Sequence, residues 1–295
     1  MRILVTGKNG QLGKSIHKIV ANNEQTNEFV FVGREELSLS NGSNIARYFE
    51  SNVFDIIINC AAYTAVDKAE EEQDLANQVN HLAVKKLAEI AKAKKSKLIH
   101  ISTDYVFDGG SDKPYTEIDK TNPVNVYGKT KLTGEKAIQE AMPTNAIIIR
   151  TSWVYSEFGS NFVKTMLKIG KERDEINVVS DQVGSPTYAT DLARVILTMV
   201  SSISKKDYQD KEQPTEIYHY SNKGEISWYE FAKEVFKNAK IDCKVNPITT
   251  QQYPAPAKRP RNTLMNKDKI SETFNFQTIN WKDSLSDYFQ SIRIM

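Results

Sequence analysis

The chain opens with MRILVTGKNGQLGKSIHKIV, residues 1–20, and this stretch decides the fold. The β-branched run RILVT predicts a buried strand, and three glycines spaced GxxGxxG (Gly7, Gly10 and Gly13) lead into a helix that begins near Gln11. In such a turn the first glycine permits the tight bend, the second lets the backbone approach a pyrophosphate, and the third lets helix and strand pack closely. The helix N-terminus offers N–H donors to the same phosphates. A glycine-rich turn that binds nothing has the same composition, but its place between the first strand and a helix favours a dinucleotide site.

Similar β-branched runs recur along the first half of the chain, and segments of helical period separate them. The runs are mostly continuous rather than alternating, as in a parallel sheet that is covered on both faces. They are RILVTG (2–7), FVFVG (29–33), FDIIINCAA (54–62), KLIHIST (97–103) and AIIIRTSWV (146–154). The sequence therefore predicts an α/β fold with a Rossmann-like, doubly wound parallel sheet and a smaller C-terminal substrate-binding lobe.

Amphipathic helices are clearest at residues 73–94 and 126–141, where apolar side chains recur at three- and four-residue spacing. In the second half of the chain the regular alternation weakens. We therefore expect residues 1–155 to form the NAD(P)-binding domain, with later segments returning to it, and residues 156–295 to form mainly the substrate-binding lobe. The polar, lysine-rich residues 201–214 are expected to form a surface loop.

Composition excludes several classes of protein. The 295 residues are 40% hydrophobic and 26% charged, enough for a sizeable core, and a formal net charge of +2 gives no electrostatic footprint for nucleic acid or an anionic membrane. The start of the chain lacks a secretory signal pattern, and no apolar run approaches the roughly 18 residues of a membrane span. Cys60 and Cys243 lie far apart without metal-ligand spacing. We expect a cytoplasmic protein with free thiols that binds neither nucleic acid nor membrane.

A candidate catalytic pair lies in YGKTKLTGE, residues 127–135. Tyr127 and Lys131 are four residues apart, so on a helix they share one face, and a neighbouring ammonium ion favours the tyrosine phenolate. An amphipathic surface pair has the same spacing. The pair follows the strand run KLIHIST, however, whose last residues, Ser102 and Thr103, carry hydroxyls that can bond the same carbonyl oxygen. This combination predicts proton donation to a carbonyl that receives a hydride.

The end of the second predicted strand bears on the choice of cofactor. Arg34 follows this strand, where an arginine can receive the 2′-phosphate of NADPH, so NADPH is the expected cofactor. Glu35 and Glu36 come next and leave NADH possible. A solvated surface arginine is the alternative interpretation of Arg34.

Several motifs resemble those of the dTDP-4-dehydrorhamnose reductase family, which belongs to the extended short-chain dehydrogenase/reductases. They are GKNGQLG (7–13), AAYTAVDKAE (61–70), STDYVFDG (102–109), YGKTKLTGE (127–135), RTSWVY (150–155), GSNFVKTML (159–167), DQVGSPTYATDLA (181–193) and RPRN (259–262). The resemblance covers nearly the whole chain. It implies NAD(P)H-dependent reduction of the C4 keto group of dTDP-4-dehydro-L-rhamnose to dTDP-L-rhamnose, for the synthesis of rhamnose-containing surface polysaccharides.

The resemblance also assigns roles to residues. It implies that Tyr127 is the proton donor, that Lys131 binds the nicotinamide ribose and lowers the pKa of Tyr127, and that Thr103 polarises the C4 carbonyl. The positions that match dinucleotide contacts of the family are Gly10, Gln11, Leu12, Ala61, Ala62, Tyr63 and Thr64. The positions that match substrate contacts are Thr103, Asp104 and Trp153.

Three of the expected substrate residues have an ordinary alternative. The Trp153 indole suits stacking on a flat base such as thymine, although a tryptophan that ends a buried strand can simply pack in the core. Arg259 and Arg261 in KRPRN have guanidinium groups that match the oxygens of a diphosphate, or they belong to a solvated basic loop.

The sequence departs from the family pattern at two places. Ser38 stands where the family usually has an aspartate that contributes to cofactor binding, which puts NADH use in doubt. Some members form a dimer around a divalent metal held by glutamates, and Ser15 matches one of those positions. We therefore expect no metal, and a monomer or homodimer.

Other functions share parts of this pattern. A related reductase that acts on another nucleotide 6-deoxy-4-keto-sugar, with the C4 epimer as product, would use the same tyrosine and lysine. A sugar-nucleotide epimerase would retain tightly bound NAD⁺ and show no net consumption of NAD(P)H. A non-catalytic, NADP-binding regulatory subunit would not need the intact set of Thr103, Tyr127 and Lys131.

Overall fold

The computed structural model describes residues 1–23, 26–204 and 212–294, so residues 205–211 of the predicted surface loop at 201–214 lie outside the described residues. Six parallel strands form the central sheet in the order β10-β5-β4-β3-β1-β2. They are β1 (Arg2–Thr6), β2 (Glu28–Val32), β3 (Ile56–Asn59), β4 (Lys97–Thr103), β5 (Ala146–Thr151) and β10 (Glu216–Tyr220). The strand order reverses direction next to β1, so the doubly wound α/β class expected from the sequence is confirmed.

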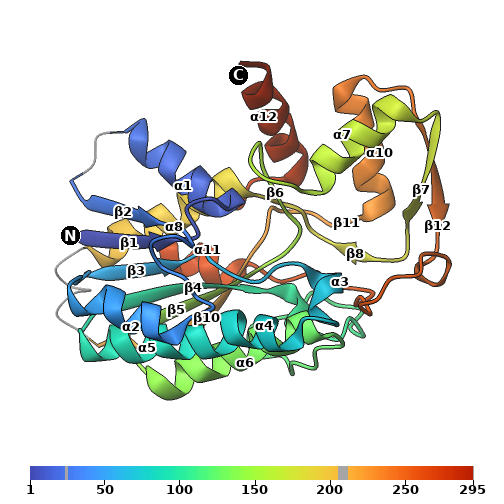
Figure 1. Ribbon diagram of the computed structural model, residues 1–295. Coiled ribbons are helices and arrows are strands. Elements are labelled where there is room, and N and C mark those ends of the chain that lie inside the picture. Colours follow the sequence, from blue (N-terminus) through green and yellow to red (C-terminus); the bar gives the residue numbers. More distant parts are fainter. Residues whose placement is uncertain (24–25, 205–211, 295) are drawn as a thin grey trace.

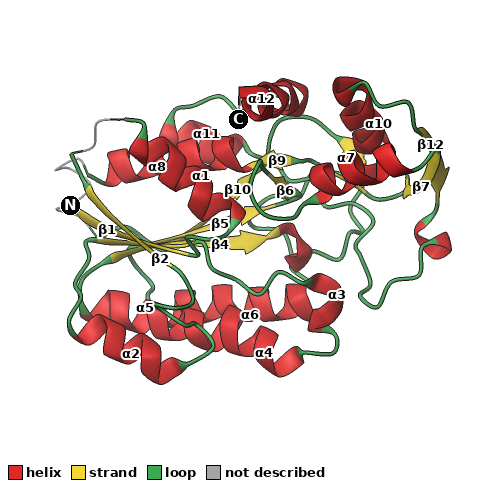
Figure 2. Ribbon diagram, turned by 45° about the horizontal axis from the view of Figure 1, so that its top comes forward, coloured by secondary structure: helices red, strands yellow, loops and turns green. Residues whose placement is uncertain are grey.

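Helices cover both faces of this sheet, as Figure 2 shows. One face carries α2 (Gly42–Glu50), α3 (Val66–Ala69), α4 (Gln73–Asn77), α5 (Ala83–Ala93) and α6 (Val126–Ala141). The other carries α1 (Gln11–Ala21), α8 (Ala189–Ile203) and α11 (Asp268–Phe274). The strands are buried on both sides, because β3 and β5 have no exposed residue, which explains their continuous apolar sequences.

The helix predicted over residues 73–94 is interrupted. It consists of α4, a π-helical turn η1 (Gln78–Leu82) and α5. Hydrophobic periodicity does not register such an insertion, because apolar residues on either side keep their approximate spacing. π-helical turns are frequent at functional sites, and this one carries the fully buried Asn80.

The second half of the chain divides between the sheet and a second lobe (Figure 1). Strand β10 pairs with β5 at one edge of the sheet, and α8 packs beside α1. The second lobe consists of the following helices and strand pairs: α7 (Phe162–Glu172), α10 (Trp228–Ala239), α12 (Trp281–Ile294), β7 (Glu175–Val179) with β12 (Lys244–Ile248), and β8 (Val183–Gly184) with β11 (Ile226–Ser227). Aromatic side chains dominate its separate core.

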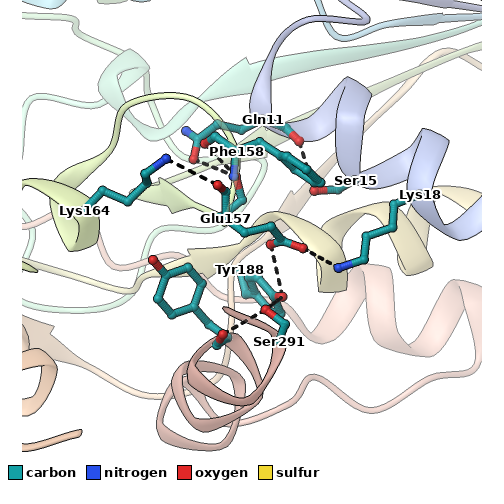
Figure 3. A network of polar contacts seen from close by, with 10 residues as sticks. Gln11, Ser15, Lys18, Glu157, Phe158, Lys164, Tyr188 and Ser291 are labelled. Carbon is teal, nitrogen blue, oxygen red and sulfur yellow. Dashed lines mark hydrogen bonds and ion pairs between the residues drawn. The ribbon is translucent and has the colours of Figure 1, made fainter. Parts of the chain in front are cut away.

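Polar contacts join the first helix of the sheet to the second lobe (Figure 3). The Gln11 carboxamide donates to the carbonyl oxygen of Val154 at 3.1 Å and accepts from Ser156 and Asn161 at 3.0 and 2.9 Å. Two helical turns further on, Lys18 of the same helix places its ammonium group 2.8 Å from the buried carboxylate of Glu157. Helix α1, which opens at the glycine turn, is therefore fixed against the segment that leads into the second lobe.

Within the described residues, no helix combines the length and the hydropathy needed to span a membrane. Cys60 and Cys243, both in the described ranges, are free thiols.

Candidate active site

A cavity of about 1190 Å³ lies where the carboxyl ends of the central strands meet the second lobe. Most residues that the sequence predicted to be functional line this one space. They are Gly7, Gly10, Gln11, Leu12, Arg34, Ala61, Ala62, Tyr63, Thr64, Thr103, Asp104, Tyr127, Lys131 and Trp153. The remaining three, Gly13, Arg259 and Arg261, lie outside this lining.

The glycine turn fits a pyrophosphate. Gly7 has φ +73°, and a Cβ atom on Gly13 would lie 2.3 Å from the Gly7 carbonyl oxygen, so the third glycine is needed for the turn to close on the helix. Among the described residues no side chain caps α1 at Gly10, and the first turn of this helix has no acidic residue. Its first N–H groups and the positive end of its dipole are thus available to an anion in the cavity.

The end of β2 leaves one basic side chain at the cavity. The carboxylate of Glu36 accepts from the Gly33 amide at 2.8 Å and is ion-paired with Lys8, and these contacts lower its pKa. Arg34 is exposed and lines the cavity, whereas Glu35 does not. Ser38, which replaces the family's aspartate, contacts the hydroxyl of Ser40 at 2.9 Å. The charge at this end of the cavity is therefore positive, which suits a phosphate more than a ribose diol.

Asn80, which the sequence reasoning missed, holds the loop after β3 in place. Its carboxamide accepts from the Tyr63 amide at 2.9 Å and donates to the Tyr63 carbonyl at 3.0 Å. It also donates to the Thr130 hydroxyl on α6 at 3.2 Å. The loop that matches the family's dinucleotide contacts is thus tied to the helix that carries the catalytic pair.

Helix α6 begins at a cap that places the catalytic pair. The Asn125 side chain accepts from the Gly128 amide at 2.7 Å, an N-cap bond that satisfies a donor of the first turn. A Cβ atom at Gly128 would lie 2.2 Å from the Tyr105 carbonyl oxygen, so only glycine lets α6 approach the segment after β4 this closely. The pair Tyr127 and Lys131 then faces the sheet and the cavity rather than solvent, with Lys131 only 1% exposed.

The pKa of Tyr127 differs from the expected direction. Burial raises it to about 12, against the opposing effect of a hydrogen bond with Thr103, and the charge of Asp104 raises it further. Lys131 is not among the groups that shift this pKa, and its Nζ atom donates to the Ile101 carbonyl oxygen at 2.6 Å. A high pKa keeps the phenol protonated, which is the state that a proton donor needs.

Ser102 and Thr103 have different hydrogen-bond partners. Consecutive residues of a strand point to opposite faces, and the Ser102 hydroxyl donates to the buried carboxylate of Glu135 on α6. The Thr103 hydroxyl instead faces the cavity side and donates to Asp104 at 3.0 Å. Ser102 also lines the cavity, but its hydroxyl hydrogen is engaged by Glu135, so a bond from both hydroxyls to one carbonyl oxygen stays a prediction.

The carboxyl group of Asp104 is unusual in this site. It is 2% exposed, and among the described residues its Oδ2 atom has no hydrogen-bond partner. Burial raises its pKa to about 6, although the neighbouring hydroxyls of Thr263 and Thr103 oppose the rise. An acceptor that faces the cavity in this state suits a hydroxyl donor of a ligand.

A buried ion pair supports the catalytic helix from the sheet side. The guanidinium group of Arg150 on β5 contacts the Glu135 carboxylate at 2.7 Å, and both side chains are at most 3% exposed. Glu135 lies one turn after Lys131, so Tyr127, Lys131 and Glu135 form one face of α6. In the sequence, only the four-residue spacing from Lys131 points to Glu135, and no motif marks its partner Arg150.

Trp153 lines the cavity in contact with a second indole. Its ring is stacked on that of Trp228, the first residue of α10, with centroids 3.6 Å apart. Trp228 also lines the cavity and was missed by the sequence reasoning, since it belongs to a helix of the second lobe.

The two arginines of KRPRN have different surroundings. The Arg259 guanidinium is paired with Asp67 at 2.8 Å, and this contact raises its pKa despite partial burial. Arg261 is exposed, and its backbone carbonyl accepts from the Val183 amide at 2.8 Å. Neither guanidinium group reaches the cavity lining.

Within the described residues no group of three histidine, cysteine or carboxylate side chains could hold a metal ion. The hydroxyl of Ser15 donates to the Gln11 carbonyl oxygen at 2.9 Å, inside its own helix.

A doubly wound sheet whose switch point carries a glycine turn beside a Tyr–Lys pair places the protein among the oxidoreductases of the short-chain dehydrogenase/reductase type. The family model described as RmlD substrate binding domain matches residues 1–294. With this match, and with the relatives described next, the chain belongs to the dTDP-4-dehydrorhamnose reductase family, as the sequence motifs indicated.

The relatives are similar over their full length. A dTDP-4-dehydrorhamnose reductase of Sinorhizobium fredii is 43% identical over 288 residues, which is 96% of this chain and 95% of that protein. The crystal structure of such a reductase from Clostridium acetobutylicum has a TM-score of 0.91 and 41% identity, covering 99% of this chain and 100% of that one. The enzyme from Bacillus anthracis, solved in complex with NADP, has a TM-score of 0.90 and 37% identity, covering 98% and 99%.

Proposed function

We propose that this protein is an NADPH-dependent reductase that converts dTDP-4-dehydro-L-rhamnose to dTDP-L-rhamnose. The observation that carries the proposal is the meeting of Thr103, Tyr127 and Lys131 with the glycine turn in one cavity. The relatives are named as dTDP-4-dehydrorhamnose reductases, and the Bacillus anthracis enzyme was solved with NADP bound, which supports this substrate and this cofactor.

The residues present fit the dinucleotide. The N-terminus of α1 and the turn at Gly10 would hold the pyrophosphate, and the Tyr63 loop would follow its nicotinamide half. Arg34 would pair with the 2′-phosphate. The nearby carboxylate of Glu36 would not compete for Arg34, because it is already ion-paired with Lys8. When bound, the reduced nicotinamide supplies the hydride.

Side chains of the protein carry out the proton transfer. Tyr127 donates its phenolic proton to the oxygen at C4 of the sugar, and its pKa of about 12 keeps the proton in place until negative charge develops on that oxygen. Thr103 adds a second hydrogen bond to the same oxygen once its hydroxyl turns away from Asp104. Lys131 stabilises the phenolate that remains.

The test is a product analysis. Incubation with NADPH and enzymatically prepared dTDP-4-dehydro-L-rhamnose should consume one NADPH for each sugar and give dTDP-L-rhamnose, identified by its NMR coupling constants at C4. A C4-epimeric product would replace the proposal by the related reductase. Sugar conversion without net NADPH consumption would replace it by an epimerase, and NADPH binding without any turnover would leave the regulatory subunit.

A further inference from the structure

A row of buried polar side chains crosses the sheet beneath the cavity and ends at Lys131. The Thr6 hydroxyl on β1 contacts the Asn59 carboxamide on β3 at 2.7 Å, and Asn59 contacts the His100 ring on β4 at 3.0 Å. The other ring nitrogen of His100 lies 3.3 Å from the Lys131 amine. All four side chains are at most 2% exposed, and the proposed reaction uses only the last of them.

The fixed donors of the backbone give the row a direction. The Ala61 amide can only donate, and it donates to the Thr6 hydroxyl oxygen at 3.2 Å. The Thr6 hydroxyl then donates to Oδ1 of Asn59, since in this buried position its hydrogen needs an acceptor. The Asn59 amide group therefore faces Nδ1 of His100 as a donor, so Nδ1 is an acceptor and the ring proton sits on Nε2.

This tautomer determines what the lysine can be. The N–H at Nε2 of His100 points at Nζ of Lys131. An ammonium ion has only N–H donors and no lone pair, so it could not accept this hydrogen bond. A neutral amine accepts this hydrogen bond with its lone pair and still donates to the carbonyl oxygen of Ile101.

The groups around Lys131 and its burial also influence whether it is an amine or an ammonium ion. Glu135 on the same helix favours the ammonium ion, but it is paired with Arg150 from β5, and Tyr127 is a neutral phenol. Burial is the largest influence and lowers the pKa of Lys131 to about 8. Burial and the adjacent lysine hold the pKa of His100 well below its usual range, so the ring itself stays neutral.

We propose that His100 is a positioning residue whose ring tautomer, oriented by Asn59, determines whether Lys131 is a neutral amine or an ammonium ion. In the arrangement described, the N–H at Nε2 of His100 favours the amine over the ammonium ion in the free protein. The ammonium ion requires the opposite arrangement: the Asn59 amide is turned over, Nδ1 of His100 carries the proton, and Nε2 accepts from Lys131. Because the ammonium ion is the form that stabilises the Tyr127 phenolate, the row sets the pH above which the reductase loses activity. This inference rests on the proposed function.

The direct test is the tautomer of His100. The protein has only four histidines, so ¹⁵N chemical shifts of ring-labelled protein resolve each nitrogen, and His100→Gln identifies the signals. We expect a protonated Nε2 and an unprotonated Nδ1 in the free protein. A protonated Nδ1 would overturn the proposal. This measurement needs no substrate, so it decides the inference even if the proposed function fails.

The second test reverses the row. In Asn59→Asp the carboxylate facing His100 can only accept, so Nδ1 must carry the proton and Nε2 becomes an acceptor for the ammonium ion. The alkaline limb of kcat/KM for NADPH, which reports the free enzyme, should move up by about one pH unit or more. An unmoved limb, with the tautomer reversed, would contradict the link to Lys131. If this variant does not fold, the tautomer of the unmodified protein decides alone.

A matched control is Asn145→Asp, the same change just before β5 at the opposite end of the sheet. There the side-chain oxygen already accepts from Lys97 at 2.8 Å. We expect the His100 tautomer and the alkaline limb to stay unchanged in this variant. A shift as large as that of Asn59→Asp would show that the added negative charge alone, and not the orientation of His100, moves the limb.

Discussion

The indole rings of Trp153 and Trp228 lie nearly parallel, with centroids 3.6 Å and planes 12° apart. Trp153 follows β5 of the central sheet and Trp228 begins α10 of the second lobe, so the pair joins the two lobes at the wall of the cavity. Phe162 supports Trp228 at a centroid distance of 4.5 Å. An apolar wall of this kind suits the flat base of a nucleotide sugar.

Trp228→Ala should therefore weaken substrate binding more than it slows chemistry. Loss of the stacked ring frees Trp153, and we expect KM for the dTDP-sugar to rise about tenfold, about 1.4 kcal/mol, with a smaller change in kcat. Steady-state kinetics of Trp228→Phe is the control, because a phenyl ring keeps an aromatic face. An unchanged KM in Trp228→Ala would show that the pair is only packing.

Gly13→Ala should strongly weaken dinucleotide binding. The added Cβ would lie 2.3 Å from the Gly7 carbonyl oxygen, so the turn must open and its N–H groups lose their common direction. NADPH titration by fluorescence should show affinity at least tenfold weaker, while circular dichroism shows whether the fold is kept. Gly42→Ala is the control, since outside its chain neighbours and its own helix backbone no described residue comes within 4 Å of its Cβ position, and it should bind normally. Unchanged affinity in a folded Gly13→Ala protein would refute the assigned pyrophosphate site.

Arg34→Ala should remove the preference for NADPH. Loss of a charge-assisted contact to the 2′-phosphate should weaken NADPH binding about tenfold or more, with no change for NADH. The ratio of the two dissociation constants is the measurement. Glu35→Gln is the control, because this neighbouring charge lies outside the cavity lining. If both variants keep the original ratio, Arg34 is a solvated surface residue.

Asp104→Asn should stabilise the protein in a pH-dependent way. The folded-state pKa of Asp104 is raised from 3.8 to about 6, so the folded protein penalises the carboxylate, and stability is lost as the pH rises through 6. The amide removes that penalty, and the gain in unfolding free energy should reach about 2–3 kcal/mol at pH 8 and vanish below pH 4. Urea unfolding at both pH values measures it, and an equal effect at pH 4 and pH 8 would exclude ionisation as the cause.

Local signals in the sequence predicted those parts of the protein that depend on neighbours in the chain. The glycine turn between β1 and α1 and the bounds of α6 follow from residues within one or two turns of each other. The Tyr127–Lys131 spacing likewise needs only the helix geometry. These features agree with the structure because no distant contact competes with them.

Long-range contacts explain what the sequence did not predict. Asn80 and Trp228 act through partners that are 17 and 75 positions away, and the π-helical turn at Asn80 leaves no trace in hydrophobic spacing. The bond from Ser102 to Glu135 was not predicted because Glu135 lies on another element. The contact of Lys131 with the Ile101 carbonyl and the burial that raises the pKa of Tyr127 both depend on how α6 meets β4.

The most direct test of the central claim compares the protein with its Tyr127→Phe variant in the oxidation of NADPH by dTDP-4-dehydro-L-rhamnose. The account predicts that the variant binds NADPH with unchanged affinity but loses about 10²-fold or more in kcat, because no other group donates the proton. Oxidation at an undiminished rate by Tyr127→Phe would contradict the account.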